Sequence, residues 1–175
     1  MRSFVLPSLK NKSLQESLAC KWIAPDMLIQ KVEQIRSDGL SIATLNGSFD
    51  LLHAGHLEII YQASIQADVL IVGLNTDSSI QSYKNPLRPI VSLEYRKQMM
   101  AAIEYVSYVT WFSETDPREM LKKINPDVHV NGSEYGENCI EAEVVKDGGG
   151  RMHIVSLVPG LSTSEIIKKI LCVCG

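Results

Sequence analysis

The chain has 175 residues and a formal net charge of −3, with 45% hydrophobic and 21% charged residues. Such a composition is typical of one globular domain that can bury a core, and a negative net charge argues against a general nucleic-acid binder, which would normally be basic. Because no apolar run approaches the roughly 20 residues needed to span a bilayer, and Pro7 interrupts the opening stretch too early for a secretory signal, we expect a cytoplasmic protein with no membrane partner.

The first part of the chain shows two helical patterns of apolar residues, at positions 14–22 and 27–35, followed by a polar stop at 37–39. No residue in this part points to chemistry. We therefore expect residues 1–39 to be an N-terminal helical extension that packs on a sheet or on a second subunit, ahead of one main domain at residues 40–175.

An apolar run at residues 42–45 is the first expected strand, and the apolar spacing further on indicates a helix that begins near Ala54 and ends near Gln66. The polar stretch between them, residues 46–56 (NGSFDLLHAGH), is a strand-to-helix turn. In an open α/β sheet such turns lie at the carboxyl edge of the strands, where ligands bind. The start of the helix also offers free N–H groups and the positive end of the helix dipole, so we expect this turn to bind an anion.

His53 and His56 are three residues apart in this turn, which places both imidazoles on one side of the first helical turn. Gly55 between them lets a phosphate or a base approach the backbone, and Gly47 suits the tight turn after the strand. Imidazoles beside a helix start can donate hydrogen bonds to a phosphate whose charge grows in a transition state. The plain alternative is that both residues merely cap and pack the helix.

A zinc site is the other alternative for the two histidines. The helical zinc signature places its histidines four apart with a Glu between them, and this turn has neither feature. The four cysteines of the chain also lack paired metal-ligand spacing. We expect reduced thiols and no protein-bound metal.

A second apolar run, at residues 68–74, has the length and composition of a parallel strand that is buried on both faces. It ends at Asn75 and Asp77, whose side chains would face the same ligand edge as the first turn. We expect them to meet substrate hydroxyls. A metal is an alternative partner, and Asp77 could instead cap a short helix.

A stretch without periodicity, residues 82–90, contains two prolines and two basic residues and is expected to be a loop. Loops at this edge commonly carry function, so Lys84 and Arg88 could close over phosphates; solvated surface charges are the alternative.

The helix that begins after Ser92 has Arg96 in its first turn, where a cation faces the unfavourable end of the dipole. An anionic partner would explain that placement.

The rest of the chain continues to alternate strands and helices. This alternation predicts an α/β fold, a Rossmann-like doubly wound sheet of five parallel strands in the order 3-2-1-4-5. His129 lies within one of the strands and is expected to pack there. The expected strands are residues 105–112, 128–130 and 152–157, and the expected helices are 116–124 and 140–145, with the glycines at 148–150 as a turn.

Two strands of this sheet end in the dipeptide Asn-Gly. In the expected order the first and fourth strands are neighbours, and the ligand crevice opens between them, where the winding reverses. Asn46 and Gly47 would then form one lip of the crevice, and Asn131 and Gly132 the other.

The last helix begins at three consecutive hydroxyl residues, Ser162, Thr163 and Ser164. Hydroxyls at a helix start can cap the helix and can also bind phosphate oxygens. Both readings are open from the residues alone.

Residues 47–56 resemble the G-x-F-D-x-x-H-x-G-H signature of the cytidylyltransferase-like nucleotidyltransferases. Within that superfamily the chain is most similar to the adenylyltransferase module of ADP-heptose synthases, over about residues 40–170. Three further stretches are similar and occur in the family's order: residues 84–90 resemble K-G-…-R-P-I with Asn85 at the usual Gly, residues 131–135 (NGSEY) stand where the family has K-G-G-D-Y, and residues 162–167 resemble S-T-T-x-I-I.

The resemblance implies a nucleotidyltransferase domain at residues 40–175 that transfers AMP from ATP to a sugar phosphate of the heptose 1-phosphate type and releases pyrophosphate. Mg²⁺ would arrive with the nucleotide, and a homodimer or higher homo-oligomer is expected. The implied roles are reaction chemistry for His53, His56 and Lys84; nucleotide binding for Ser48, Phe49, Gly55, Arg88, Arg96, Asn131, Gly132, Ser162, Thr163 and Ser164; and acceptor binding for Asp50, Asn75 and Asp77.

Two other functions remain open at this point. One is cytidylyl transfer from CTP to glycerol 3-phosphate or a phosphoalcohol, which a preference for CTP over ATP would reveal. The other is a nucleotide-binding protein without turnover, which would bind ATP and release no pyrophosphate. The intact histidines and Lys84 speak against the second of these.

Overall fold

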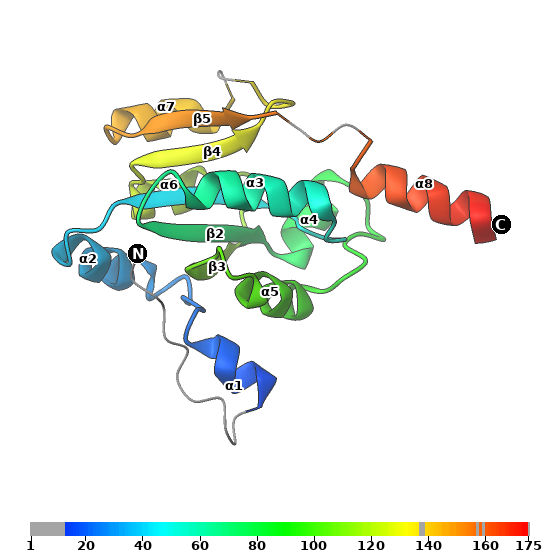
Figure 1. Ribbon diagram of the computed structural model, residues 1–175, viewed down its shortest axis with the longest axis horizontal. Helices are drawn as coiled ribbons and strands as arrows, with labels where there is room; N and C mark the ends of the chain where they lie inside the picture. Colours follow the sequence, from blue (N-terminus) through cyan, green and yellow to red (C-terminus); the bar gives the residue numbers. More distant parts are fainter. Residues whose placement is uncertain (1–12, 137–138, 157, 159, 175) are drawn as a thin grey trace.

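The computed structural model describes residues 13–136, 139–156, 158 and 160–174. Its centre is a sheet of five parallel strands in the order β3-β2-β1-β4-β5 (Figure 1). The strands are β1 (Ile42–Gly47), β2 (Val69–Asn75), β3 (Tyr108–Phe112), β4 (Val128–Gly132) and β5 (Arg151–Val155). The expected fold class and strand order are confirmed.

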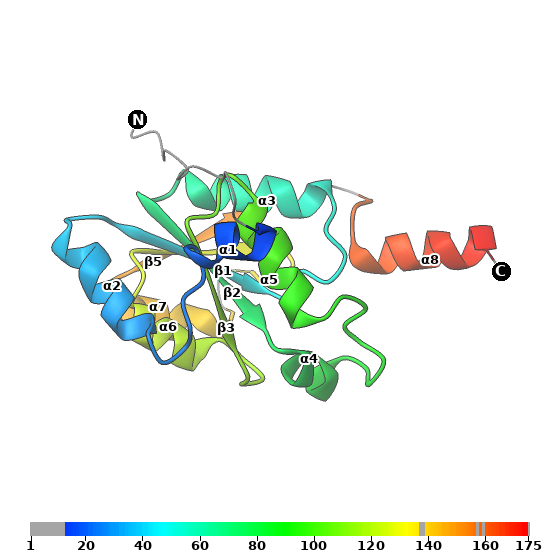
Figure 2. The same cartoon turned by 90° about the horizontal axis from the view of Figure 1, so that it is seen from below.

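Helices cover both faces of this sheet (Figure 2). Residues from α3 and α5 pack in a core on one face, with α1 at its margin, and residues from α2, α6 and α7 pack in a core on the other. Two more helices, α4 and α8, lie beyond the carboxyl edge of the strands. The helices are α1 (Leu14–Ala19), α2 (Leu28–Ser37), α3 (Ala54–Ser64), α4 (Asp77–Tyr83), α5 (Leu93–Ala102), α6 (Arg118–Ile124), α7 (Glu141–Asp147) and α8 (Thr163–Cys174).

The strand β2 shows how the sequence produces these two cores. Successive side chains of a strand point to opposite faces, so Leu70 and Val72 enter the core beneath α3 and α5, whereas Val69 and Ile71 enter the core beneath α2 and α6. All seven residues of β2 are buried. A strand covered on both faces needs apolar residues at every position, which explains the continuous apolar run in the sequence.

Residues 13–39 pack onto the sheet. Trp22 forms a parallel bridge with Val109 of β3, and Ile23 and Leu28 are buried in the core beneath α2 and α6. The division of the chain at residue 39 stays a prediction, and residues 1–12 of the expected extension lie outside the described part.

The third strand begins later than the sequence pattern indicates, at Tyr108. The residue before it, Ser107, accepts the backbone N–H of Leu70 with its side-chain oxygen, and the regular ladder starts only where Tyr108 pairs with Ile71. The backbone N–H of Ser107 still donates to the carbonyl of Leu70 at 3.1 Å, so the Ser107 hydroxyl replaces only a backbone carbonyl as the acceptor for Leu70. None of the helices in the described ranges is long and apolar enough to cross a membrane.

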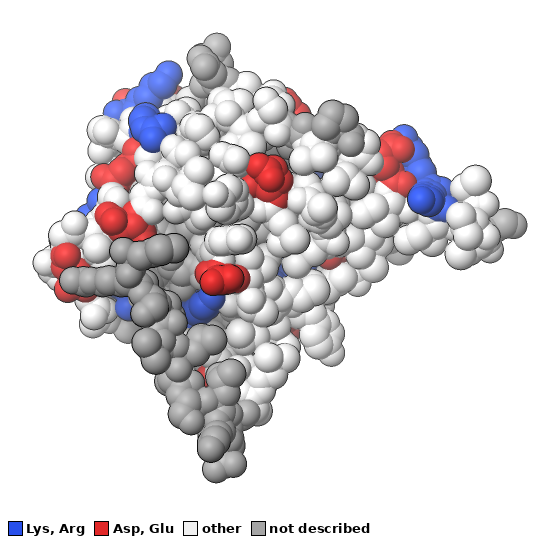
Figure 3. Space-filling model, in the orientation of Figure 1, with Lys and Arg blue, Asp and Glu red and all other residues white. Residues whose placement is uncertain are grey.

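The last helix, α8, extends away from the body as an arm (Figure 1). None of its residues is buried. Charged side chains gather on its first half, and its far part is uncharged (Figure 3); there Ile170, Leu171 and Val173 are each more than half exposed. The far part of α8 thus presents apolar side chains to solvent.

Candidate active site

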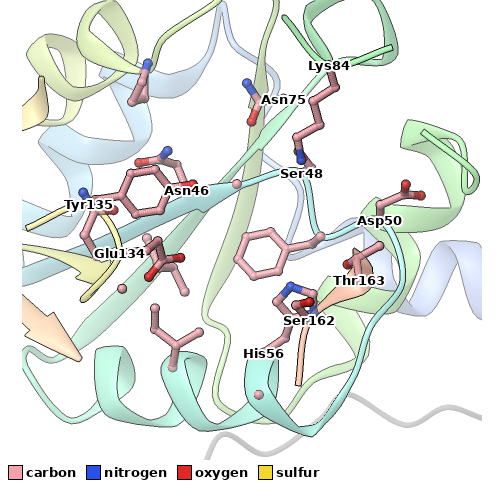
Figure 4. A pocket seen from close by; sticks show the side chains of 18 of the residues that line it. Asn46, Ser48, Asp50, His56, Asn75, Lys84, Glu134, Tyr135, Ser162 and Thr163 are labelled. Atoms are coloured by element: carbon pink, nitrogen blue, oxygen red, sulfur yellow. The ribbon is translucent and has the colours of Figure 1, made fainter. Parts of the chain in front are cut away.

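A cavity of about 690 Å³ opens at the carboxyl edge of the sheet. Both Asn-Gly dipeptides line it, one at the end of β1 and one at the end of β4. Because β1 and β4 are neighbours in the sheet, the cavity lies where the winding of the sheet reverses. In Figure 4 one side of the cavity carries Lys84, Asp50, Ser162 and Thr163, and the other carries Asn46, Glu134 and Tyr135.

The turn between β1 and α3 has an unusual backbone at Phe49, whose φ is +45°. A positive φ costs energy for any residue with a side chain, and such strain is typical of functional sites. Here it directs the ring of Phe49 back over Gly47, where a Cβ would lie 3.1 Å from the ring. The ring of His56 lies 5.1 Å from that of Phe49, centroid to centroid. The absence of a side chain at Gly47 thus makes room for this arrangement.

The two imidazoles of the turn are stacked, with centroids 3.8 Å apart and an interplanar angle of 20°. His53 is the N-cap of α3, and its side chain makes no capping hydrogen bond, so the ring is available to a ligand. Gly55 allows this stack, because a Cβ there would lie 3.1 Å from the ring of His53. The structure thus brings both predicted histidines to the cavity wall.

Both imidazoles are neutral at pH 7 in the free protein. Burial lowers the pKa of His53. Burial, with smaller contributions from the nearby His53 and Lys84, lowers the pKa of His56 to about 4. The Nδ1 atoms of both rings are buried without a hydrogen-bond partner among the described residues. A neutral imidazole donates through one nitrogen and accepts through the other, so this pair has unused hydrogen-bonding capacity.

Lys84 lies at the cavity wall with its ammonium 3.0 Å from the hydroxyl of Ser48. The same hydroxyl lies 3.0 Å from that of Tyr83. Partial burial lowers the pKa of Lys84, and the positive charge of Arg88 lowers it further. A phosphate would oppose both effects, because a nearby anion favours the charged ammonium.

Asp50 is 2% exposed and holds the loop that carries Arg88. One carboxylate oxygen accepts the backbone N–H groups of Ile90 and Val91, each at 2.8 Å. The other oxygen lies 2.8 Å from the guanidinium of Arg88. Both residues line the cavity, so the predicted acceptor ligand Asp50 is occupied in positioning a predicted phosphate ligand.

Arg96 is a correction to the expected site. Its side chain is completely buried and it is not among the residues that line the cavity. The guanidinium donates to the backbone oxygens of Val91, Ser48 and Asn75 at 3.0, 2.7 and 2.8 Å. The carbonyls at the ends of β1 and β2 need donors once they are buried, and Arg96 supplies them. The anionic partner that its helix position suggested is a protein carboxylate.

That carboxylate belongs to Asp77, which is the second correction. Asp77 lies 2.7 Å from Arg96 and accepts the backbone N–H of Leu93 at 2.9 Å. It does not line the cavity, and the residue that caps α4 is Thr76. The expected acceptor ligand therefore serves to fix Arg96 and the start of α5.

The other strand-end residues are placed as the sequence suggested. Asn75 lines the cavity and donates to the hydroxyl of Ser79 at 3.0 Å. Asn131 and Gly132 line the opposite lip, where the carboxylate of Glu134 lies over Gly132, so that a Cβ there would clash with it.

The start of α8 closes the remaining side. All three of its predicted hydroxyl residues line the cavity. Ser162 accepts the backbone N–H of Glu165 at 3.1 Å and so caps the helix. Within the described part of the chain the hydroxyls of Thr163 and Ser164 make no such capping bond, so they are the ones left to meet a ligand.

Several lining residues were not anticipated. Asp116 follows β3, and the rule that polar residues at strand ends face the ligand edge would have found it. Tyr83 and Glu141 lie within or beside short helices, and their sequence context gives no comparable signal. No cluster of three or more His, Cys, Asp or Glu able to hold a metal occurs among the described residues.

The family model for cytidylyltransferase-like proteins matches residues 44–169. Curated proteins named bifunctional protein HldE are similar in sequence. The one from Methylobacillus flagellatus is 40% identical over 146 residues, and the one from Citrifermentans bemidjiense is 38% identical over 147 residues; each match covers 83% of this chain and 30% of the relative. The chain thus spans under a third of the length of these relatives.

Two solved structures share the fold. The lipopolysaccharide core biosynthesis protein from Thermoplasma volcanium matches with a TM-score of 0.55 and 24% identity, covering 69% of this chain and 98% of that one. A pantoate-beta-alanine ligase from Francisella tularensis matches with a TM-score of 0.54 and 16% identity, covering 82% of this chain and 77% of that one. Together with the family match, the fold and the histidine-bearing turn lead to one conclusion: the chain belongs to the cytidylyltransferase-like family.

Proposed function

We propose that this chain is a nucleotidyltransferase that transfers AMP from ATP to a sugar phosphate of the heptose 1-phosphate type and releases pyrophosphate. The observation that carries the proposal is the stacked pair His53 and His56 at the start of α3, on the wall of the cavity. The sequence resemblance to the adenylyltransferase module of ADP-heptose synthases supports the choice of base and acceptor, as do the HldE relatives.

The reaction needs no protein nucleophile. An oxygen of the acceptor phosphate forms a bond to the α-phosphorus of ATP, and the bond from that phosphorus to the bridging oxygen breaks, so that pyrophosphate leaves with the electron pair. The acceptor phosphate is already anionic at pH 7. The protein must therefore hold two anions in line and offset the charge that develops at the α-phosphate and the leaving oxygen.

The histidines are suited to that task because they are neutral in the free protein. A neutral imidazole does not trap the ground-state anion, yet its N–H can donate to an oxygen whose charge grows during the reaction. The triphosphate itself would raise the pKa of His56, since a nearby negative charge favours the imidazolium. We assign His53 and His56 to the α-phosphate and its bridging oxygen, and Lys84 and Arg88 to the phosphates.

The remaining roles follow from position. The hydroxyls of Thr163 and Ser164 would receive the triphosphate tail at the start of α8, and the lip formed by Asn131 and Gly132, together with Phe49, would hold the nucleoside. Arg96 and Asp77 are assigned a positioning role in place of direct contact with the substrate.

Mg²⁺ is part of the proposal as a companion of the nucleotide. Two carboxylates at or near the cavity are engaged by protein cations, Asp50 by Arg88 and Asp77 by Arg96, and the described residues contain no group of three or more His, Cys, Asp or Glu that could hold a metal. Such a set offers no cage for the ion, whereas Mg²⁺ commonly binds through substrate phosphates and water. When bound, it would neutralise phosphate charge.

We also infer that the protein works in the cytoplasm, where ATP is available, and that it self-associates. The exposed apolar side chains on the far half of α8 favour self-association. Light scattering of the purified protein at two concentrations measures its mass, and a monomer at both would contradict this part of the proposal.

Pyrophosphate release by the purified protein with Mg²⁺ tests the function. ATP and CTP are each offered with heptose 1-phosphate, glycerol 3-phosphate or phosphoethanolamine. We expect release with ATP and the heptose phosphate. A preference for CTP with glycerol 3-phosphate would replace the proposal by cytidylyl transfer, and ATP binding with no release for any acceptor would contradict catalysis.

A further inference from the structure

Glu141 is a buried acid in the cavity wall that the proposed reaction does not use. It is the first residue of α7, lines the cavity and is 5% exposed. Its Oε2 atom has no hydrogen-bond partner among the described residues. Burying a carboxylate oxygen without a donor is costly, so a donor from a bound ligand would stabilise this arrangement.

The neighbours of Glu141 do not supply that donor to Oε2. Asn131 uses its amide nitrogen on the sulfur of Cys139, at 3.4 Å. Burial raises the pKa of the Cys139 thiol, and a hydrogen bond to Glu141 raises it further. A raised pKa favours the protonated thiol, and the Oε2 atom of Glu141 is left as a free acceptor.

A second free acceptor lines the same cavity. The Oδ1 atom of Asn46, at the end of β1, is buried and has no partner in the described part of the chain. Asn46 lies on the side of the cavity that also carries Glu134 and Tyr135 and that faces Lys84 and Ser162 (Figure 4). A ligand with its phosphates toward Lys84 and Ser162 would place its other end here, and that end must offer hydrogen-bond donors.

The surroundings favour a flat, partly apolar group at this end. Leu45, Ile59 and Ile140 line the cavity together with Glu141. A nucleobase has apolar faces and a polar edge, so it suits a wall that combines aliphatic side chains with a few placed acceptors. A sugar presents hydroxyls around its whole perimeter and would need more polar partners than these residues offer.

Building on the proposed function, we propose that Glu141 accepts a hydrogen bond from the exocyclic amino group of the nucleobase and thereby selects adenine or cytosine over their keto counterparts. Hypoxanthine or uracil would place a carbonyl oxygen where the amino group of adenine or cytosine lies. Two acceptors facing each other cannot form a hydrogen bond, and the buried carboxylate would stay unpaired. Sites built this way reject the mismatched analogue.

The test compares nucleotide binding in the absence of an acceptor, so that it does not depend on turnover. Dissociation constants for ATP and ITP, and for CTP and UTP, are measured by calorimetry for the unaltered protein and for Glu141→Gln. We expect the unaltered protein to bind ATP at least about tenfold more tightly than ITP, and Glu141→Gln to reduce that ratio to within about threefold, because an amide can donate to a keto oxygen. Glu143→Gln, an exposed acid on the same helix, should keep the original ratio.

The outcomes separate this inference from the proposed function. An unchanged ratio in Glu141→Gln, or no discrimination by the unaltered protein, overturns the assignment of Glu141 even if pyrophosphate is released. A ratio that collapses supports it even if no acceptor gives turnover. If Glu134→Gln collapses the ratio and Glu141→Gln does not, the assignment is also overturned. Should Glu141→Gln melt early, Glu141→Asp keeps the charge but shortens its reach, and it should weaken ATP binding about tenfold while preserving the order of preference.

Discussion

The two walls of the cavity are held in different ways. The sheet wall, formed by residues 46–56, continues directly from buried strands, and its carbonyl at Ser48 is bonded to the buried Arg96. The α8 wall, formed by residues 162–164, begins a helix with no buried residue that extends from the body. The sheet wall is thus fixed before a ligand arrives, whereas the capping bond of the α8 wall, from Glu165 to Ser162, stays within the start of that helix.

This difference suggests a division of labour. Groups that stabilise a transition state are most effective when they are already in place. If they must reorganise during the reaction, the free energy of that reorganisation offsets the stabilisation they provide. The histidines stand on the fixed wall. Groups that only retain a flexible triphosphate tail can tolerate movement, and the hydroxyls of α8 stand on the exposed wall. Altering the first wall should change stability and turnover, and altering the second should change affinity.

The largest effect is expected for Arg96→Lys, which removes the support of the sheet wall. A lysine cannot meet the carbonyls and the carboxylate that the guanidinium bonds together, so buried acceptors would be left unpaired. We expect the free energy of unfolding, measured by urea denaturation, to fall by about 3–5 kcal/mol. The exposed pair of Arg118 with Asp116 provides the control, because Arg118→Lys should cost less than about 1 kcal/mol. Equal losses would contradict the role of Arg96.

The next effect concerns the reaction itself. His56→Ala should lower turnover by more than about a hundredfold, which is about 2.7 kcal/mol of transition-state stabilisation, with little change in the melting temperature. His153→Ala removes an imidazole of β5 that is not at the cavity and should leave turnover unaltered. Turnover by His56→Ala within a few-fold of the unaltered rate would remove that residue from the mechanism.

The sheet beneath the fixed wall should make stability sensitive to acid. His129 is buried opposite Thr44, with its Nδ1 atom 2.8 Å from the hydroxyl, and burial lowers its pKa to about 3. Below the ordinary pKa of about 6.5 the unfolded chain binds a proton that the folded chain does not, so stability falls as the pH drops from 6.5 toward 3.

The corresponding measurement is urea unfolding of the unaltered protein and of His129→Gln at pH 7 and pH 5. Between pH 6.5 and 5 the unaltered protein should lose about 1.4 kcal/mol per pH unit more than the variant, since one fewer titrating group remains in the variant. Parallel losses would show that His129 does not control the acid response.

The smallest effect is expected on the α8 wall. The double variant Thr163→Val and Ser164→Ala removes two hydroxyls but keeps Ser162, which caps the helix. We expect the KM for ATP to rise about three- to tenfold, because the nucleotide loses one or two modest hydrogen bonds. The kcat should stay within about twofold of that of the unaltered protein. Ser37→Ala, at the end of α2, serves as the control. A loss confined to kcat would show that the two walls do not divide the work as proposed.

The architecture was predictable because its signals are local and repeated. Each buried parallel strand is a short apolar run, and each is followed by a polar turn, so the strand order and the shared edge of the Asn-Gly dipeptides follow from the winding rule. The histidine pair was predictable for the same reason, since the spacing of His53 and His56 alone sets their side of α3.

What the sequence could not show is which partner a side chain finds across the fold. Arg96 in a first helical turn correctly indicates an anion, but the helix pattern does not reveal that Asp77 and the strand-end carbonyls lie nearer than any ligand. Glu141 was missed because an acid at the start of a short helix is ordinary. Its lack of a partner emerges only from burial in three dimensions.

The bonding of Arg96 has a consequence for how related sequences should diverge. Since Arg96 and Asp77 join strand ends, their retention should be independent of the acceptor that a given relative uses. Relatives that differ in acceptor should vary at positions that face the cavity, such as Asn75, and keep this pair. Where one member of the pair is replaced, the other should be replaced with it.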